Sequence, residues 1–245
     1  MLMHAALLAL QTTFAASPPP AAVPFGVGET FEYSARMGFL RGGKAWLRVE
    51  AVEPVRGVPS WHFSFDTKVN VAGVYKSESR FDSWTGVNDF ISRRFIKDME
   101  EHGGRHVQDF RIHPDSGFFR RGADTGTKAT STRPIDDIAL FYYVRTVPLA
   151  VGKTYTWNNY WRKSQNPVTV KVLKREEMKL PDGRKVQAFV LHPIVDEKNG
   201  MFSRKSDARL WVTDDFHRIP VQIQTTYDFG TVKLVLVDMK LKTKG

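Results

Sequence analysis

The chain has 245 residues, of which 42% are hydrophobic, 12% aromatic and 25% charged, a composition that indicates a folded protein and excludes wholesale disorder. Its 36 Lys and Arg against 26 Asp and Glu give a formal net charge of +10, which favours contact with anionic lipid headgroups, acidic polysaccharide or nucleic acid, although solubility alone would also explain the charge. The sequence contains no Cys, which excludes disulfides, thiolate metal sites and a lipid-modified N-terminal cysteine within it.

The beginning of the sequence has features of an exported protein. An apolar run from Met3 to Leu10 precedes small residues, and this pattern predicts a signal peptide over residues 1–15, although no Lys or Arg stands before the run. The run is too short for a membrane span, which needs about 20 apolar residues. Residues 16–24 are rich in proline and predict an extended linker. We therefore expect a periplasmic or secreted protein.

From residue 25 onward, side chains alternate between apolar and polar with a period of two. In WHFSFDTKV, Trp61, Phe63 and Phe65 fall on one face and His62 and Ser64 on the other, which is typical of a half-buried strand. The same alternation occurs in KAWLRVEAV, PVTVKVL and RIPVQIQTTY. Short turns such as PVRGVP and LPDGRK separate these stretches. The pattern predicts a mainly β protein in which residues 25–245 form one domain around a curved antiparallel sheet.

The chain also contains signs of an internal duplication. VGETFEY at 27–33 matches VGKTYTW at 151–157, and GVYKSESRFDSW, ending at Trp84, matches GMFSRKSDARLW, ending at Trp211. GRHVQDFRIHP and GTVKLVLVDMK then follow in the same order. Segments that recur in order at nearly constant spacing predict two β repeats, residues 25–122 and 149–245, which build one open-barrel-like sheet or two facing sheets.

Between these repeats, TRPIDDIALFYYVRTV predicts the one helix, over residues 132–147. Thr132 can cap its N-terminus, and Asp136 and Asp137 lie in the first turn, where the helix dipole favours anions. We therefore interpret both aspartates as capping charges and not as catalytic groups. Apolar residues cover nearly every face of this helix, so we expect it to be buried against the concave side of the sheet.

No motif in the sequence indicates catalysis. RLWVTDDFHRIP brings Asp214 and Asp215 close to His217, but alternating runs on both sides predict a hairpin with its turn at these residues. The matching turn, TGVNDF in the first repeat, has no such carboxylate pair. His102 and His106 have metal-ligand spacing for a helix, but the GGR between them argues against a helix. We expect no cofactor, no metal and no enzymatic activity.

Thirty aromatic residues must pack in the core, line a cavity or lie at an interface, since the sequence has 6 Trp, 17 Phe and 7 Tyr. One interpretation is core packing alone. The other is a helix-capped concavity that binds a lipid or another amphiphile, and its candidate residues are Phe65, Tyr142, Tyr143, Trp157 and Trp211. The candidates for contact with an anionic headgroup or membrane surface are Arg93, Arg94, Arg120, Arg121, Arg204 and Lys205. Basic and aromatic residues do not interleave as in RNA-binding modules, so we do not expect a nucleic-acid partner.

Three stretches together resemble the bacterial family called domain of unknown function 3108: FGVGETFEYSARMGFLRGGKAWLRVE, DDIALFYYVRTVPLAVGKTY, and ARLWVTDDFHRIPVQI with FGTVKLVL after it. The resemblance implies an exported protein of a Gram-negative bacterium, without catalytic residues to carry over. The last hairpin is also similar, at the level of the fold, to periplasmic lipoprotein carriers of the Lol system, whose curved sheet shelters acyl chains. Two alternatives to amphiphile binding stay open, a structural or protein-interaction role in the cell envelope and a hydrolase. A cavity holding a carboxylate pair beside a basic group would favour the hydrolase.

Overall fold

The computed structural model describes residues 23–38, 40–71, 75–101, 104–198, 200–228 and 230–241. The predicted signal peptide over 1–15, most of the predicted linker over 16–24, and His102 lie outside these residues. Fourteen strands, one α-helix and three short 3-10 helices make up the described part of the chain.

The strands occur in two groups along the chain. The first group is β1 (Thr30–Met37), β2 (Leu40–Val55), β3 (Val58–Val71), β4 (Tyr75–Gly86), β5 (Ser92–Glu101), β6 (Gly104–His113), β7 (Phe118–Arg121) and β8 (Lys128–Ala129). The second group is β9 (Thr154–Trp157), β10 (Val168–Lys179), β11 (Lys185–Ile194), β12 (Arg209–Thr213), β13 (Pro220–Tyr227) and β14 (Gly230–Lys240). The helix α1 (Asp137–Thr146) lies between the groups, and the 3-10 helices are η1 (Pro114–Ser116), η2 (Lys163–Gln165) and η3 (Arg204–Ser206).

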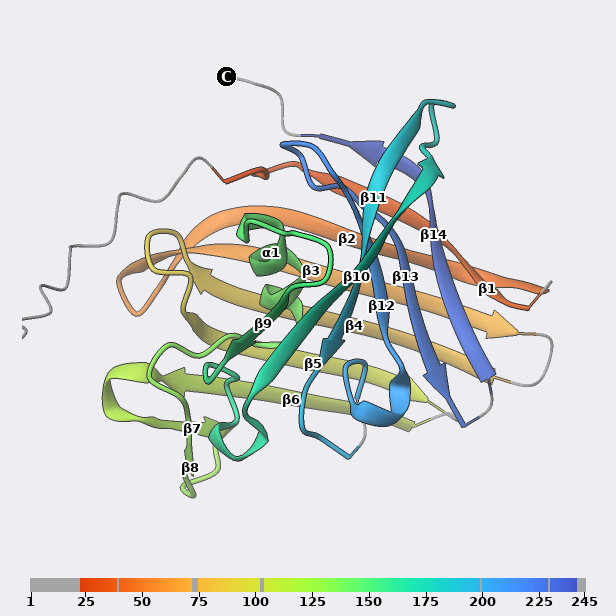
Figure 1. Ribbon diagram of the computed structural model, residues 1–245. Coiled ribbons are helices and arrows are strands. Elements are labelled where there is room, and N and C mark those ends of the chain that lie inside the picture. Colours follow the sequence, from red (N-terminus) through yellow and green to blue (C-terminus); the bar gives the residue numbers. More distant parts are fainter. Residues whose placement is uncertain are drawn as a thin grey trace, which may run out of the picture.

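All fourteen strands belong to one sheet, in the order β8-β7-β6-β5-β4-β3-β2-β1-β14-β13-β12-β11-β10-β9. Each pairing is antiparallel, and strands that follow one another in sequence are neighbours within each group. The two groups join where β1 pairs with β14, while β8 and β9 remain as the two ends of the sheet. The sheet curves around α1 without closing into a barrel (Figure 1). The predicted fold class is confirmed.

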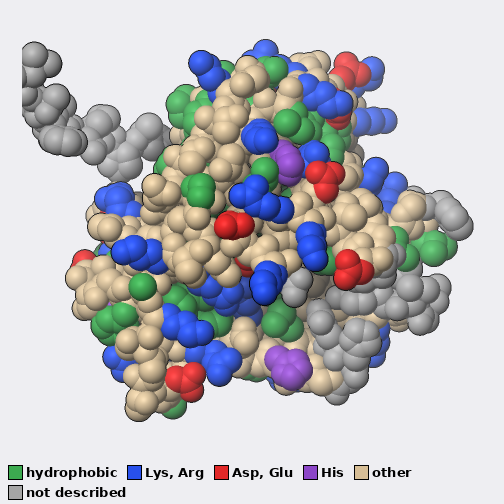
Figure 2. Space-filling view, turned by 60° about the horizontal axis from the view of Figure 1, so that its bottom comes forward, with side chains coloured by type: hydrophobic (Ala, Val, Ile, Leu, Met, Phe, Trp, Pro, Cys, Tyr) green, Lys and Arg blue, Asp and Glu red, His purple; other side chains and the backbone are tan. Residues whose placement is uncertain are grey.

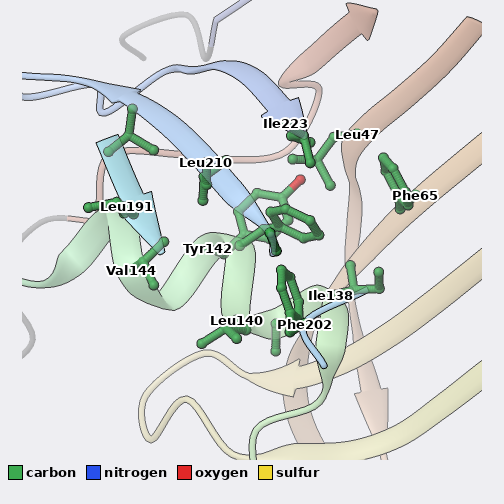
Figure 3. Close-up of a cluster of buried hydrophobic side chains, with 14 of the residues drawn as sticks. Leu47, Phe65, Ile138, Leu140, Tyr142, Val144, Leu191, Phe202, Leu210 and Ile223 are labelled. Atoms are coloured by element: carbon green, nitrogen blue, oxygen red, sulfur yellow. The ribbon is translucent and has the colours of Figure 1, made fainter. Parts of the chain in front are cut away.

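The concave side of the sheet is filled by side chains. Tyr142 of α1 stacks on Phe63 of β3 with ring centroids 3.8 Å apart, and Phe141 packs against Phe65 at 5.8 Å. Phe202, from the segment between β11 and β12, contacts Phe141 from the other side at 5.3 Å. Figure 3 shows these groups converging with aliphatic side chains from both strand groups around the helix. The predicted placement of the helix against the concave side is therefore correct, and the helix with its neighbours fills most of the hollow.

The helix starts later than the sequence predicts. It begins at Asp137 and not near residue 132, and its N-cap is Asp136, whose Oδ1 accepts the backbone N–H groups of Ile138 and Ala139. Thr132 does not cap the helix, because the residues before Asp136 bond to a distant part of the chain. Ser131 donates its hydroxyl to the backbone oxygen of Tyr160 at 2.7 Å, which holds this stretch out of the helix.

Corresponding local structures recur in the two groups of strands. The N–H of Gly28 donates to the carbonyl of Val49 at 2.9 Å, and the N–H of Gly152 donates to that of Val172 at 2.9 Å. Both glycines have positive φ, +86° and +81°, which explains the repeated glycine in VGET and VGKT. In both groups the register of the receiving strand shifts directly after this valine. The internal duplication stays a prediction, and these correspondences support it.

Two tryptophans extend the correspondence to the outer face of the sheet. The indole N–H of Trp84 donates to Glu53, and that of Trp211 donates to Glu176 at 2.8 Å. In each case the carboxylate stands on the strand two places along the sheet from the tryptophan. A structural role for both tryptophans follows, because a capped indole N–H and a buried ring stabilise the outer face.

The residues 214–218 form the predicted turn between β12 and β13. The Oδ1 of Asp215 accepts the N–H groups of His217 and Arg218, and Asp214 forms an ion pair with Arg218 at 3.1 Å. The matching turn of the first repeat contains one aspartate and not a pair, and this Asp89 also pairs with the residue four positions later, Arg93, at 2.6 Å. Both turns use an aspartate and an arginine to hold the chain, which is a structural role.

Candidate functional site: a cavity at the open edges of the sheet

A cavity of about 640 Å³ lies where the two ends of the sheet face each other. This volume falls within the range of about 300–1,000 Å³ that is usual for ligand pockets. Its walls come from β6, β7 and β8 on one side and from the segment between β9 and β10 on the other. The lining residues are Gln108, Phe110, Phe119, Arg120, Arg121, Asp124, Gly126, Lys128, Ala129, Arg162, Ser164 and Gln165.

The cavity exists because the sheet is bridged but not closed. Trp161, fully buried, reaches from the β9 side and packs on Phe110 and Phe119, with ring centroids 4.6 and 4.8 Å apart. The hydroxyl of Thr130 donates to the carbonyl of Trp161 at 2.6 Å, which ties the β8 side to the β9 side. The two ends are thus joined through side chains and one short stretch of backbone, and the cavity remains beside this bridge.

Two cations that face the cavity form no ion pair with a described carboxylate. Lys128 comes from β8, and Arg162 comes from the opposite side. Arg120 also belongs to the lining, but it alternates with the inward Phe119 along β7 and its guanidinium lies 5.2 Å from the ring centre of Phe118, so its side chain lies on the outer face. By contrast Arg121, also in the lining, pairs with Asp124 at 3.4 Å. Figure 2 shows the molecule turned so that the bottom of Figure 1 comes forward. On this face Lys and Arg predominate over Asp and Glu and lie beside hydrophobic side chains. The cavity is therefore electropositive.

Two of the polar groups in the lining are buried without a hydrogen-bond partner. These atoms are the Nε of Arg120 and the Oε1 of Gln165. A buried polar group without a partner costs about 1–3 kcal/mol, and neither atom is open to the cavity. Arg162 makes cation–π contacts with two rings, because its guanidinium lies 4.4 Å from the ring centre of Trp161 and 5.5 Å from that of Phe110.

A buried charged cluster stands near Arg162. Asp137 accepts from the Nζ of Lys97 at 2.8 Å and from the hydroxyl of Tyr160 at 2.5 Å. Burial acts to raise the pKa of Asp137, but Lys97 and Tyr160 outweigh it and the pKa lies below its usual value. Burial, with the nearby charge of Asp137, raises the pKa of Glu197 to about 7. These carboxyl groups interact, yet neither lines the cavity, whose described lining has Asp124 as its one carboxylate. The arrangement therefore lacks the carboxylate pair that would favour a hydrolase.

The residues predicted to bind a ligand do not share one site. Phe65 and Tyr142 are buried in the core, where Phe65 packs on Phe141 and Tyr142 packs on Phe63. Tyr143 and Trp157 are partly exposed and contact each other, with ring centroids 5.3 Å apart. The concavity next to Phe65 retains a cavity of about 80 Å³, far below the usual size of a ligand pocket.

The prediction that Trp211 faces the concavity is wrong. Its neighbour Leu210 lines a small gap on the concave side together with Leu140 and Val144 of α1, and successive residues of a strand point to opposite faces. Trp211 therefore lies on the outer face, where it pairs with Gln222 of β13.

The predicted basic rim is also dispersed. Arg93 is bound to Asp89, and Arg94 pairs with Asp109 at 2.9 Å. Arg204 of η3 lies 3.3 Å from a carboxylate oxygen of Asp196, and Lys205 of η3 is exposed. These four side chains are not in the lining of the large cavity. Of the predicted basic residues, the cavity brings together Arg120 and Arg121.

Sequence reasoning missed the part of the site that lies between β9 and β10. The crowding of Tyr155, Trp157, Tyr160 and Trp161 was a signal for it, since these aromatics exceed what one strand face needs. Nothing in the local pattern showed that Trp161 would cross to β6 and β7, because that contact depends on how the whole sheet curves.

The described residues contain no group of His, Asp and Glu side chains suited to holding a metal ion. His106 is exposed on β6. His102, which stands four residues before it, lies outside the described residues. Within the described ranges, no helix has the length and apolar character needed to cross a membrane.

The fold is similar to that of a protein from Brucella abortus, whose crystal structure is described as a beta-barrel-like protein of domain of unknown function DUF1849. The match has a TM-score of 0.56 and 13% sequence identity, and it covers 89% of this chain and 99% of that one. The hypothetical protein CT021 from Chlamydia trachomatis gives a TM-score of 0.35 at 7% identity, over 88% of this chain and 89% of that one. No curated protein matches the sequence.

The family model described as "Protein of unknown function (DUF3108)" matches residues 32–237, which confirms the resemblance found in the sequence. The matched range runs from β1 into β14 and includes α1 and every residue of the cavity lining. The chain belongs to the DUF3108 family.

Proposed function

We propose that this protein is an exported, non-catalytic binding protein of the cell envelope, which holds an amphiphile with an anionic group in the cavity between the ends of its sheet. The observation that carries the proposal is the pairing of aromatic walls with two cations, Lys128 and Arg162, that form no ion pair among the described residues. Export is supported by the predicted signal peptide over residues 1–15.

The two kinds of lining suit the two parts of an amphiphile. Phe110 and Phe119 present apolar surface to the cavity, where each methylene group removed from water contributes about 0.8 kcal/mol. Lys128 and Arg162 supply positive charge, and in a recessed site their attraction for an anion is screened less than on open surface. One ligand with a short apolar segment and a charged end would satisfy both.

The proposed site differs from the concavity expected from the sequence. The concave side is occupied by α1 and Phe202, and the space that remains there is about 80 Å³. The cavity at the open ends of the sheet, at about 640 Å³, is the better candidate because it has both volume and charge.

A second candidate function is contact with an envelope protein through a strand edge. Residues 104–108 of β6 pair with β5 alone among the described strands, and Val107 is 59% exposed on this edge. An edge with free N–H and C=O groups can pair with a strand from another chain. The charged and polar neighbours Arg105 and His106 weaken this candidate, since such residues commonly protect an edge from pairing.

Native mass spectrometry of the protein purified from its host tests the proposal. We expect an adduct with the mass of an amphiphile, which organic extraction removes. The charge reversal Lys128→Glu should reduce adduct occupancy, whereas Lys153→Glu, at an exposed lysine outside the cavity, should not.

A bare chain mass in all three proteins would contradict the proposal. If a stoichiometric protein partner accompanied that bare mass, the strand-edge role would be favoured instead.

A further inference from the structure

The lining of the cavity carries more positive charge than a singly charged ligand can balance. The charged side chains that point into the cavity are Arg121, Lys128, Arg162 and Asp124, so the net charge is 3 − 1 = +2. The pair formed by Arg121 and Asp124 accounts for one charge of each sign. Lys128 and Arg162 then face the same cavity without a described ion pair, although the charge of Arg162 also acts on the buried Asp137 and Glu197.

These two cations approach the cavity from separate elements. Lys128 stands on β8, at one end of the sheet. Arg162 stands beside η2, on the opposite side. A ligand between them is therefore contacted from both sides of the opening. A head group with acceptor oxygens in several directions fits this arrangement better than a planar carboxylate, which presents two oxygens at one edge.

The guanidinium of Arg162 has a constrained plane. It lies 4.4 Å from the ring centre of Trp161. Arginine binds phosphate oxygens through paired N–H donors, and stacking leaves those donors at the edge of the guanidinium free to do so.

We infer that the cavity selects a phosphomonoester end group over monoanionic and zwitterionic ones, an inference that rests on the proposed amphiphile binding. A phosphomonoester carries about −1.5 to −2 charges at neutral pH and three terminal acceptor oxygens, which matches the two charges of Lys128 and Arg162 around one space. A phosphodiester carries one negative charge and two such oxygens, so it leaves one of these cations uncompensated. A choline head group adds its own positive charge and is repelled.

Calorimetric titration with short-chain lipids tests this selectivity. The probes are dihexanoyl phosphatidic acid, phosphatidylglycerol and phosphatidylcholine below their micelle concentrations, with inorganic phosphate as the soluble phosphate. We expect phosphatidic acid to bind at least about tenfold more tightly than phosphatidylglycerol, because one further charge-assisted contact is made. Phosphatidylcholine should not bind measurably. Inorganic phosphate should bind weakly, because it gains nothing from Phe110 and Phe119.

Variants connect the selectivity to the named side chains. Arg162→Gln and Lys128→Gln should each weaken phosphatidic acid binding about tenfold and phosphatidylglycerol binding less. The ratio of the two affinities should therefore become smaller in each variant. Lys153→Gln makes the same change in net charge outside the cavity, and it should leave both affinities within about twofold. Lys128 and Lys153 are exposed, so these two substitutions should not prevent folding, and thermal melts followed by circular dichroism verify this for all three variants.

The outcomes separate this inference from the proposed function. Equal affinity for phosphatidic acid and phosphatidylglycerol would overturn the phosphomonoester inference while amphiphile binding survives. Inorganic phosphate binding as tightly as phosphatidic acid would support the head-group chemistry and contradict the amphiphile. Absence of binding by every probe would overturn both.

Discussion

Asp136 provides a sharp test of how the buried interior is built, because one substitution removes its charge and another removes its hydrogen bonds. Its carboxylate is fully buried at the start of α1, where Oδ1 accepts two backbone N–H groups and Oδ2 accepts the hydroxyl of Ser83 at 2.7 Å. Burial raises the pKa of Asp136 from 3.8 to about 6. Asp136→Asn keeps an acceptor oxygen for the cap and cannot ionise.

The magnitude follows from the change in pKa. The difference between 3.8 and about 6, at about 1.36 kcal/mol for each pKa unit, corresponds to on the order of 3 kcal/mol. Because the folded-state pKa is the higher one, this contribution to stability is present in full below pH 3.8 and is lost as the pH rises through about 6. About half of the loss has occurred by pH 5, and about 1.5 kcal/mol of it falls between pH 5 and pH 8. The variant does not undergo this loss.

Urea unfolding followed by tryptophan fluorescence at pH 5, 6, 7 and 8 measures the effect. The free energy of unfolding of Asp136→Asn, minus that of the unaltered protein, should rise by about 1.5 kcal/mol from pH 5 to pH 8. Glu197, whose pKa is raised to about 7, titrates in both proteins and cancels in this difference. Asp136→Ala removes the cap and should be destabilised by about 1–2 kcal/mol relative to Asp136→Asn at every pH. A difference curve that stays flat with pH, or equal destabilisation by Asn and Ala at pH 8, would refute the reasoning.

Further predictions concern the packing that holds the two halves together. Glu29 and Arg145 form a buried ion pair at 2.7 Å with 1% and 0% side-chain exposure, so Glu29→Ala should cost about 3–5 kcal/mol by leaving a buried charge without its partner. Lys153, the exposed residue after the matching glycine turn in the second half, is the control, and Lys153→Ala should change the free energy of unfolding by less than about 0.5 kcal/mol. Phe202→Ala should destabilise by about 3–5 kcal/mol because Phe202 fills the concave side, whereas Phe216→Ala, at a residue 62% exposed, should have little effect. Urea unfolding measures the loss of stability in each buried-site variant and in its exposed control. Equal losses in a variant and its control would contradict the burial of Glu29 or Phe202.

The fold was largely predictable because the sheet is a meander in which sequence neighbours pair. Period-two alternation locates strands such as β3 directly, and the glycine turns at Gly28 and Gly152 mark the beginning of each half. The pairing of β1 with β14 joins the two ends of the chain, and no local pattern specifies it. Sequence reasoning therefore left open whether the halves form one sheet or two.

The errors arose where a long-range contact overrides a local preference. Thr132 is a good N-cap by type, but the bonds that Thr130 and Ser131 make to residues 160 and 161 hold the preceding chain outside the helix. Trp211 was expected in the concavity because aromatic residues are commonly buried there. Side chains alternate between the two faces along β12, and this alternation places Trp211 on the outer face, where Glu176 accepts its indole N–H.

The cavity itself could not be read from the sequence. Its cations stand in β7, β8 and the segment after β9, and within each of these segments a basic residue has the pattern of an ordinary exposed charge. They meet only because the curved sheet brings its two ends together. The aromatic crowding around Trp161 was the one local signal that this segment is unusual.

A crystal structure of the protein with dihexanoyl phosphatidic acid tests the central claim most directly. We predict phosphate density within hydrogen-bonding distance of Lys128 and Arg162, with an acyl chain along Phe119. Ligand density on the concave side beside α1, or an empty cavity at a lipid concentration that saturates binding in solution, would contradict the proposed site.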